Sequence, residues 1–110
     1  MAYDEELAER IRALMTGADV TEQRMFGGLA FLVGGNMAVA ASGQGGLMVR
    51  FDPDETDALA AEPHTRPFEM GGREMRGWLR VDTEGVRGEP ELRRWVERGA
   101  AYARSLPPKK

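Results

Sequence analysis

Residues 29–41 read Leu-Ala-Phe-Leu-Val-Gly-Gly-Asn-Met-Ala-Val-Ala-Ala, two short apolar runs on either side of a glycine pair. Runs of this length that are bounded by turn residues are typical of strands. The Gly34-Gly35-Asn36 segment between them has the composition of a tight hairpin turn. The stretch therefore predicts an antiparallel β-hairpin.

Further strands are predicted on both sides of this hairpin. Leu47–Phe51 follows a glycine-rich turn at residues 42–46, and alternation places Met48 and Arg50 together on one side of it. Glu22–Phe26 precedes the hairpin and is a candidate for one more strand. The sequence predicts a meander of three or four antiparallel strands.

The first two helices are predicted from their starts and stops. Asp4 caps a helix that carries one apolar stripe and ends at Gly17. A second, short helix begins at Asp52-Pro53-Asp54-Glu55, where Asp52 caps the helix, Pro53 fits its first position and Glu55 completes a capping box. Pro63 ends this helix near Ala61.

The last part of the chain predicts two strands and a long helix. The strands are Arg66–Met70 and Glu74–Val81, and Pro67 places the first of them at a sheet edge. The helix starts at Pro90 and ends at Pro107-Pro108. Its apolar face comprises Leu92, Trp95, Val96, Gly99, Ala103 and Leu106.

Helices segregated from an antiparallel sheet make an α+β architecture, and 110 residues without a linker or repeat predict one domain over residues 1–110. One sheet face is expected to meet the long helices. The other is expected to meet water, the short helix or a second subunit, and a homodimer is predicted on this ground.

Charge is distributed unevenly. Residues 93–110 hold six basic residues and one acid, Glu97, in a chain whose net charge is -3. Two groups are candidate partner-binding residues: Arg93, Arg94, Arg98 and Arg104 on the exposed face of the last helix, and Arg73, Arg76 and Arg80 around Trp78. A basic end is also what a direct nucleic-acid binder needs, so that alternative stays open.

Residue types exclude several chemistries. The chain has no cysteine and a single histidine, His64, so thiolate sites and histidine clusters are excluded. The glycine pairs lack the spacing of phosphate-binding loops, and the acid pairs lie at helix starts that capping explains. We expect no catalytic, cofactor or metal site. A small-ligand site between sheet and helices remains the third hypothesis.

The acidic N-terminus does not read as a signal peptide, and no apolar run has the length of a membrane span. A cytoplasmic location without membrane association is therefore expected.

Several segments together carry a family resemblance. They are Arg24-Met25-Phe26-Gly27-Gly28-Leu29-Ala30-Phe31, Leu47–Phe51, Arg66-Pro67-Phe68, Gly72–Leu79, Trp95-Val96 and Ala103–Lys109. In order and spacing they resemble the N-terminal domain of the TfoX/Sxy family, in its short stand-alone members.

The resemblance implies the element order α-β(3)-α-β(2)-α, similar to secretion-chaperone-like domains, which often pair. The family's named members regulate natural competence as co-activators beside a cyclic-AMP receptor-type transcription factor. Full-length members add a second, C-terminal helical domain, and we expect a chain of 110 residues to have no room for it. No catalytic residue is carried over.

The Met25-Phe26-Gly27-Gly28 run is interpreted as a structural motif, a tight passage between strands. The leading hypothesis is a non-catalytic protein-binding module, a transcriptional co-regulator whose partner is a protein such as a transcription factor. Its expected surfaces are the uncovered sheet face and the arginine face of the last helix.

Overall fold

The computed structural model describes residues 4–25, 27–43 and 45–107. The helices are α1 (Glu5–Leu14), α2 (Thr56–Ala60) and α3 (Glu89–Ser105), with 3-10 turns η1 (Pro53–Glu55) and η2 (Thr83–Val86). The strands are β1 (Val20–Met25), β2 (Gly28–Val33), β3 (Asn36–Ala41), β4 (Leu47–Arg50), β5 (Thr65–Met70) and β6 (Arg73–Val81). The predicted α+β class is confirmed.

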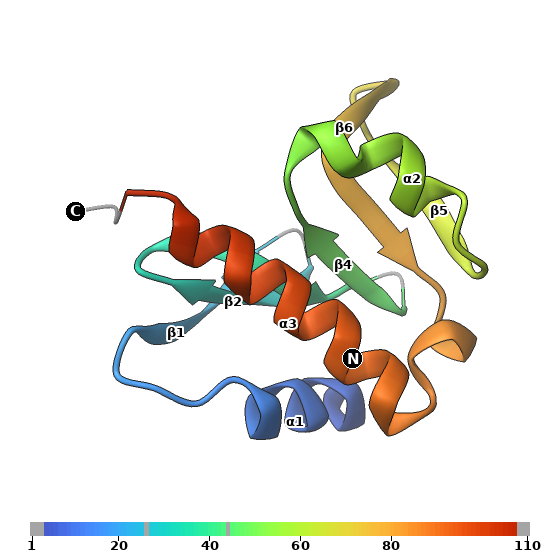
Figure 1. The fold of residues 1–110 in the computed structure, drawn as a ribbon. Helices are drawn as coiled ribbons and strands as arrows, with labels where there is room; N and C mark the ends of the chain where they lie inside the picture. Colours follow the sequence, from blue (N-terminus) through green and yellow to red (C-terminus); the bar gives the residue numbers. More distant parts are fainter. Residues whose placement is uncertain (1–3, 26, 44, 108–110) are drawn as a thin grey trace.

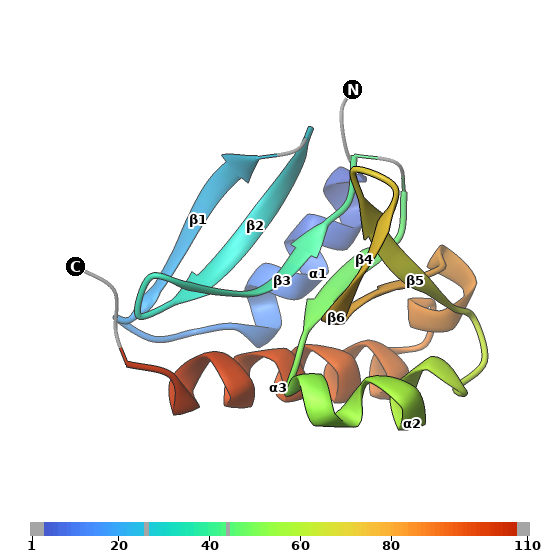
Figure 2. The ribbon, with the colours of Figure 1, turned by 90° about the horizontal axis from the view of Figure 1, so that it is seen from above.

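The strands form one antiparallel sheet in the order β1-β2-β3-β4-β6-β5. The predicted hairpin is its β2–β3 pair, with Phe31 opposite Val39. The first group contains four strands instead of the three implied by the resemblance, because β1 pairs with the whole of β2. Pro67 lies on the edge strand β5, as predicted. In Figure 2, β1 and β5 run in clearly different directions, so the sheet is strongly twisted.

The main core lies between one face of the sheet and the helices, and Figure 1 shows α3 crossing that face. α1 begins where predicted, since the Asp4 carboxylate accepts from the Leu7 backbone N–H at 3.1 Å. Its apolar stripe enters the core through Leu7 and Ile11. The fully buried large side chains of this core include Phe31, Phe51, Ile11, Leu47, Leu79 and Leu92.

The segment before α2 differs in one detail from the prediction. Asp52 caps as expected, accepting from the Asp54 N–H at 2.9 Å. Glu55, however, directs its carboxylate to Arg98 of α3, at 3.3 Å, instead of turning back to complete a capping box. α2 also sends Leu59 into the main core. The short helix therefore lies on the same face of the sheet as α3.

At Gly99 the backbone of α3 lies close to the sheet. A Cβ at this position would lie 2.5 Å from the carbonyl oxygen of Ala38 and 2.9 Å from Cγ1 of Val39. Neither distance is compatible with a real side chain. Glycine is therefore required here for steric reasons, although glycine lowers helix propensity.

The opposite face of the sheet corrects an expectation. Five of its side chains form a second apolar cluster, and their exposed fractions are 9% or less: Ala30, Leu32, Met37, Ala40 and Met48. The half-buried rings of Phe68 and Trp78, 5.8 Å apart, pack against this cluster. The face is thus not the uncovered surface that the sequence predicted, and the short helix does not lie on it. The structure does not show the open apolar face on which the homodimer prediction was based. The homodimer itself stays a prediction.

The β1–β2 connection contains the Met-Phe-Gly-Gly run. Met25 is the last residue of β1 and Gly28 the first of β2, while Phe26 lies outside the described residues. Gly27 has a φ of +74°, which other residues rarely adopt. A Cβ on Gly28 would lie 2.3 Å from the carbonyl oxygen of Ala41. Backbone conformation at Gly27 and close backbone packing at Gly28 therefore favour glycine at both positions.

The edge strand β1 is tied to α1 by an ion pair. Arg12 donates to the two carboxylate oxygens of Glu22, at 2.6 and 2.8 Å. These hydrogen bonds lower the pKa of Glu22 below its ordinary value of 4.5, against a smaller opposing effect of burial, and the positive charge of Arg12 adds to the lowering.

None of the helices in the described part of the chain has the length and apolar character that a membrane crossing requires.

We expect Gly99→Ala to lower the free energy of unfolding by about 1–2 kcal/mol, measured by urea denaturation. Overpacking costs ~1–3 kcal/mol, and better helix propensity returns part of it. Ala101→Gly, on the exposed side of α3, is the matched control and reports the propensity effect alone, about 1 kcal/mol. A Gly99→Ala protein more stable than the wild type would contradict the close contact.

Glu22→Gln should remove a pH-dependent contribution to stability. Because the folded pKa of Glu22 is lowered, its contribution is present above pH 4.5 and is lost as the pH falls through the folded pKa. At pH 7 we expect the variant to be ~0.2–1 kcal/mol less stable than the wild type, and the difference to vanish in strong acid. Urea denaturation across this pH range measures it, with Glu69→Gln as the control at an exposed carboxylate that shows no ion pair. A difference that does not change with pH would argue against the pair.

Candidate partner-binding groove

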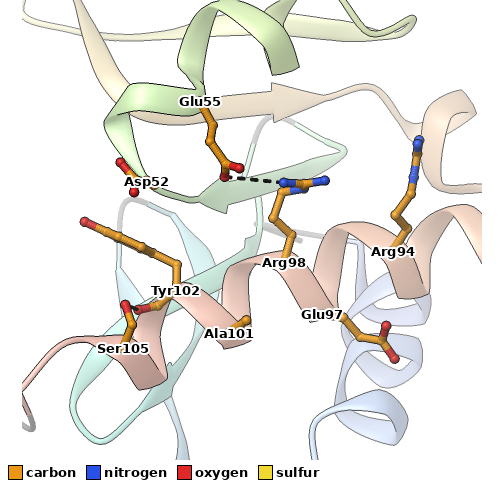
Figure 3. A pocket seen from close by; sticks show the side chains of 8 residues that line it. All are labelled: Asp52, Glu55, Arg94, Glu97, Arg98, Ala101, Tyr102 and Ser105. Carbon is orange, nitrogen blue, oxygen red and sulfur yellow. Dashed lines mark hydrogen bonds and ion pairs between the residues drawn. The ribbon is translucent and has the colours of Figure 1, made fainter.

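A groove of about 450 Å³ runs between α3 and the segment that leads into α2. α3 forms one wall, and η1 with its capping residue forms the other. Figure 3 shows Tyr102 extending toward Asp52 at one end, the Glu55–Arg98 pair in the middle and Arg94 beyond it. The lining residues are Asp52, Glu55, Arg94, Glu97, Arg98, Ala101, Tyr102 and Ser105.

Two ion pairs join α3 to the α2 region. Arg98 lies 3.3 Å from the Glu55 carboxylate, and Arg94 lies 3.1 Å from that of Glu62. The two arginines are four positions apart along α3, so both project from one face of the helix. Arg94 also lies over the ring of Trp95, 5.6 Å from its centroid. The arginine face of α3 therefore meets carboxylates supplied by a distant part of the chain.

The other two predicted arginines of α3 also have acidic partners. Arg93 lies 3.6 Å from Glu89, one turn earlier on α3, and Arg104 lies 3.6 Å from Asp19, which precedes β1. These pairs are half exposed, so each contributes little to stability. They do neutralise much of the positive charge that the sequence gathers near its end.

The second predicted group is divided by the structure. Trp78 and Arg80 are half-buried on the outer face of β6, whereas Arg73 is exposed at the start of that strand. Arg76 turns toward α2: it donates to the Pro53 carbonyl at 3.1 Å and lies 3.5 Å from the Asp57 carboxylate. Trp78 of this group is linked to the groove through one further residue.

That link is Arg50, which the sequence placed on the correct side of its strand but did not single out. Arg50 is the last residue of β4 and stands directly opposite Trp78 in the sheet register. Its guanidinium carbon lies 5.5 Å from the ring centroid of Trp78 and 5.5 Å from that of Tyr102. Tyr102 lies one turn after Arg98 on α3. It is not among the residues predicted from the sequence, but its helical spacing from Arg94 and Arg98 could have placed it on the same face of the helix.

The sequence model of the TfoX N-terminal domain matches residues 12–103. The chain belongs to the TfoX N-terminal domain family. The match extends from within α1 to near the end of α3 and so contains the whole sheet, α2 and most of the groove. Searches of curated proteins and of solved structures gave no match.

In this TfoX N-terminal domain, His64 lies away from the groove. It is exposed in the turn before β5, with a φ of +66°, and its carbonyl accepts from the Asp82 N–H at 2.8 Å. Gly27 and Gly28 lie in the β1–β2 turn and do not line the groove. Over residues 4–25, 27–43 and 45–107, no three His, Cys, Asp or Glu side chains gather as metal ligands would.

Proposed function

We propose that the chain is a non-catalytic, cytoplasmic protein-binding module that acts as a transcriptional co-regulator and binds its partner along the α2–α3 groove. The observation that carries this proposal is the pairing of the α3 arginines with carboxylates. Arg93, Arg94, Arg98 and Arg104 each have an acidic partner within 3.6 Å.

This pairing favours a protein partner over a nucleic acid. A nucleic-acid surface needs unopposed positive charge to displace counterions from phosphates. The groove instead presents both signs of charge close together, with the Tyr102 ring and Ala101 also in its lining. Mixed charge beside an aromatic side chain is typical of protein interfaces, in which tyrosine and arginine are enriched.

Family membership supports the regulatory part of the proposal. The match spans most of the chain. The resemblance described from the sequence implies a role as a co-activator beside a transcription factor. A transcription factor or a polymerase subunit is accordingly the partner that we propose.

The test is capture of partners from the host by the tagged protein, with and without nuclease, followed by mass spectrometry. We expect a transcription factor or polymerase subunit that resists nuclease. The Arg94→Ala/Arg98→Ala double variant should retain at most about a fifth of it, because interface arginines contribute ~1–2 kcal/mol or more when they are central. Arg24→Ala, an exposed arginine on β1, is the control and should retain all of it. Equal capture by the double variant would remove the groove from the proposal.

The nucleic-acid alternative predicts a different result. Binding to a labelled duplex would weaken steeply with salt, with a slope that reports the number of phosphates neutralised. We expect no saturable binding at 50 mM salt, measured by fluorescence anisotropy. Saturable binding with a steep salt slope that is lost in the Arg94→Ala/Arg98→Ala variant would replace the protein-binding proposal.

A further inference from the structure

Arg50 differs from the other arginines around the groove. Its guanidinium makes no hydrogen bond and no ion pair with any described residue, and its interactions are the two aromatic contacts. The described arginines that similarly show no acidic partner, Arg24, Arg73 and Arg87, are exposed. Arg50 alone among these four is half-buried. A partly desolvated cation with unused donors requires an explanation.

The two rings position this cation. Trp78 reaches it from β6 and Tyr102 from α3, so elements far apart in the sequence fix one side chain. A cation over an aromatic ring is held by the ring's negative face, an attraction of electrostatic origin. No oxygen of a described residue accepts a hydrogen bond from the N–H groups of this guanidinium. The fork of donors is therefore held beside the two rings and is available for a ligand.

The ligand that matches this fork is a carboxylate. A planar guanidinium and a planar carboxylate form two parallel hydrogen bonds, and the geometry is specific to arginine. A doubly charged phosphate fits the surroundings less well. Among the described residues, Arg50 is the one cation available to such a phosphate, and the Asp52 carboxylate lies at the same end of the groove, beside Tyr102. The Asp52 carboxylate repels a singly charged side chain less than it repels a doubly charged phosphate.

We propose that Arg50, flanked by Trp78 and Tyr102, binds a single Asp or Glu side chain of the protein partner at the end of the groove. This inference rests on the proposed function and names the chemistry by which the partner is recognised. It adds Arg50 and Tyr102 to the residues that the sequence indicated, and it gives Trp78 the role of positioning Arg50.

The direct test is NMR titration with two matched peptides, acetyl-Ala-Glu-Ala-amide and acetyl-Ala-Gln-Ala-amide, and with inorganic phosphate at constant ionic strength. The observed signals are the Arg50 Nε–H and the Trp78 indole N–H. We expect saturable shifts with the glutamate peptide alone. Arg50→Gln should weaken binding about ten- to a hundredfold, as for loss of hydrogen bonds to a charged group, and Arg50→Lys should weaken it several-fold.

Arg24→Gln is the matched control and should leave the titration unchanged. Thermal melting checks that each variant is folded, and Arg50→Lys, which keeps the charge, serves if Arg50→Gln is unstable. Equal shifts with the glutamine peptide, tighter binding of phosphate than of the glutamate peptide, or unchanged affinity in the folded Arg50 variants would overturn the inference.

Partner capture separates this inference from the proposed function. If the wild type and Arg50→Gln capture the same regulator equally, the carboxylate site is wrong and the co-regulator proposal stands. If no regulator is captured but the glutamate peptide titrates on Arg50, the co-regulator proposal fails and the carboxylate site stands.

Discussion

The contact between Gly99 and β3 is the constraint on which the rest of the structure depends. With no Cβ at Gly99, the backbone of α3 comes close enough to the Ala38 carbonyl for the helix to lie directly on the sheet. The same approach seats Trp95 and Val96 in the main core. It also fixes the rotation of α3 about its axis, and that rotation turns Arg94, Arg98 and Tyr102 toward the α2 region. One glycine thus links core packing to the geometry of the groove. Because the helix is rigid, the rotation that seats one of its faces in the core also sets the direction of the residues on its other faces.

Charge in this protein is organised by the fold and not by the order of residues along the chain. The basic end of the sequence meets acids from Asp19, Glu55 and Glu62, which lie far from it along the chain. At half-exposed positions such pairs add little stability. Their larger effect is on the surface charge, because they replace a positive stripe with a surface of mixed charge. Arg50 of β4 differs from these paired arginines, because its contacts are with aromatic rings.

Much of the fold could be predicted from the sequence, because its signals are local. The Asp4 cap, the turn at Gly34-Gly35 and the edge position of Pro67 each depend on neighbouring backbone groups, and the structure bears out all three. The candidate site was predicted only in part. The spacing of Arg94 and Arg98 on one helix face was visible in the sequence. Arg50 was placed on the correct side of its strand, but nothing local predicted its contacts with two aromatic rings.

The sequence by itself determined the α+β class, the element order, the helix caps and the family to which the chain belongs. These follow from hydrophobic period and turn chemistry, which act over a few residues. Only the tertiary structure decided that the outer sheet face is closed by Phe68 and Trp78, and that Glu55 reaches Arg98 instead of capping its own helix. It also decided that Trp78 and Tyr102 meet at Arg50. Each of these contacts joins residues distant in the chain, and their meeting depends on sheet twist and on the packing of α3, which no local pattern encodes.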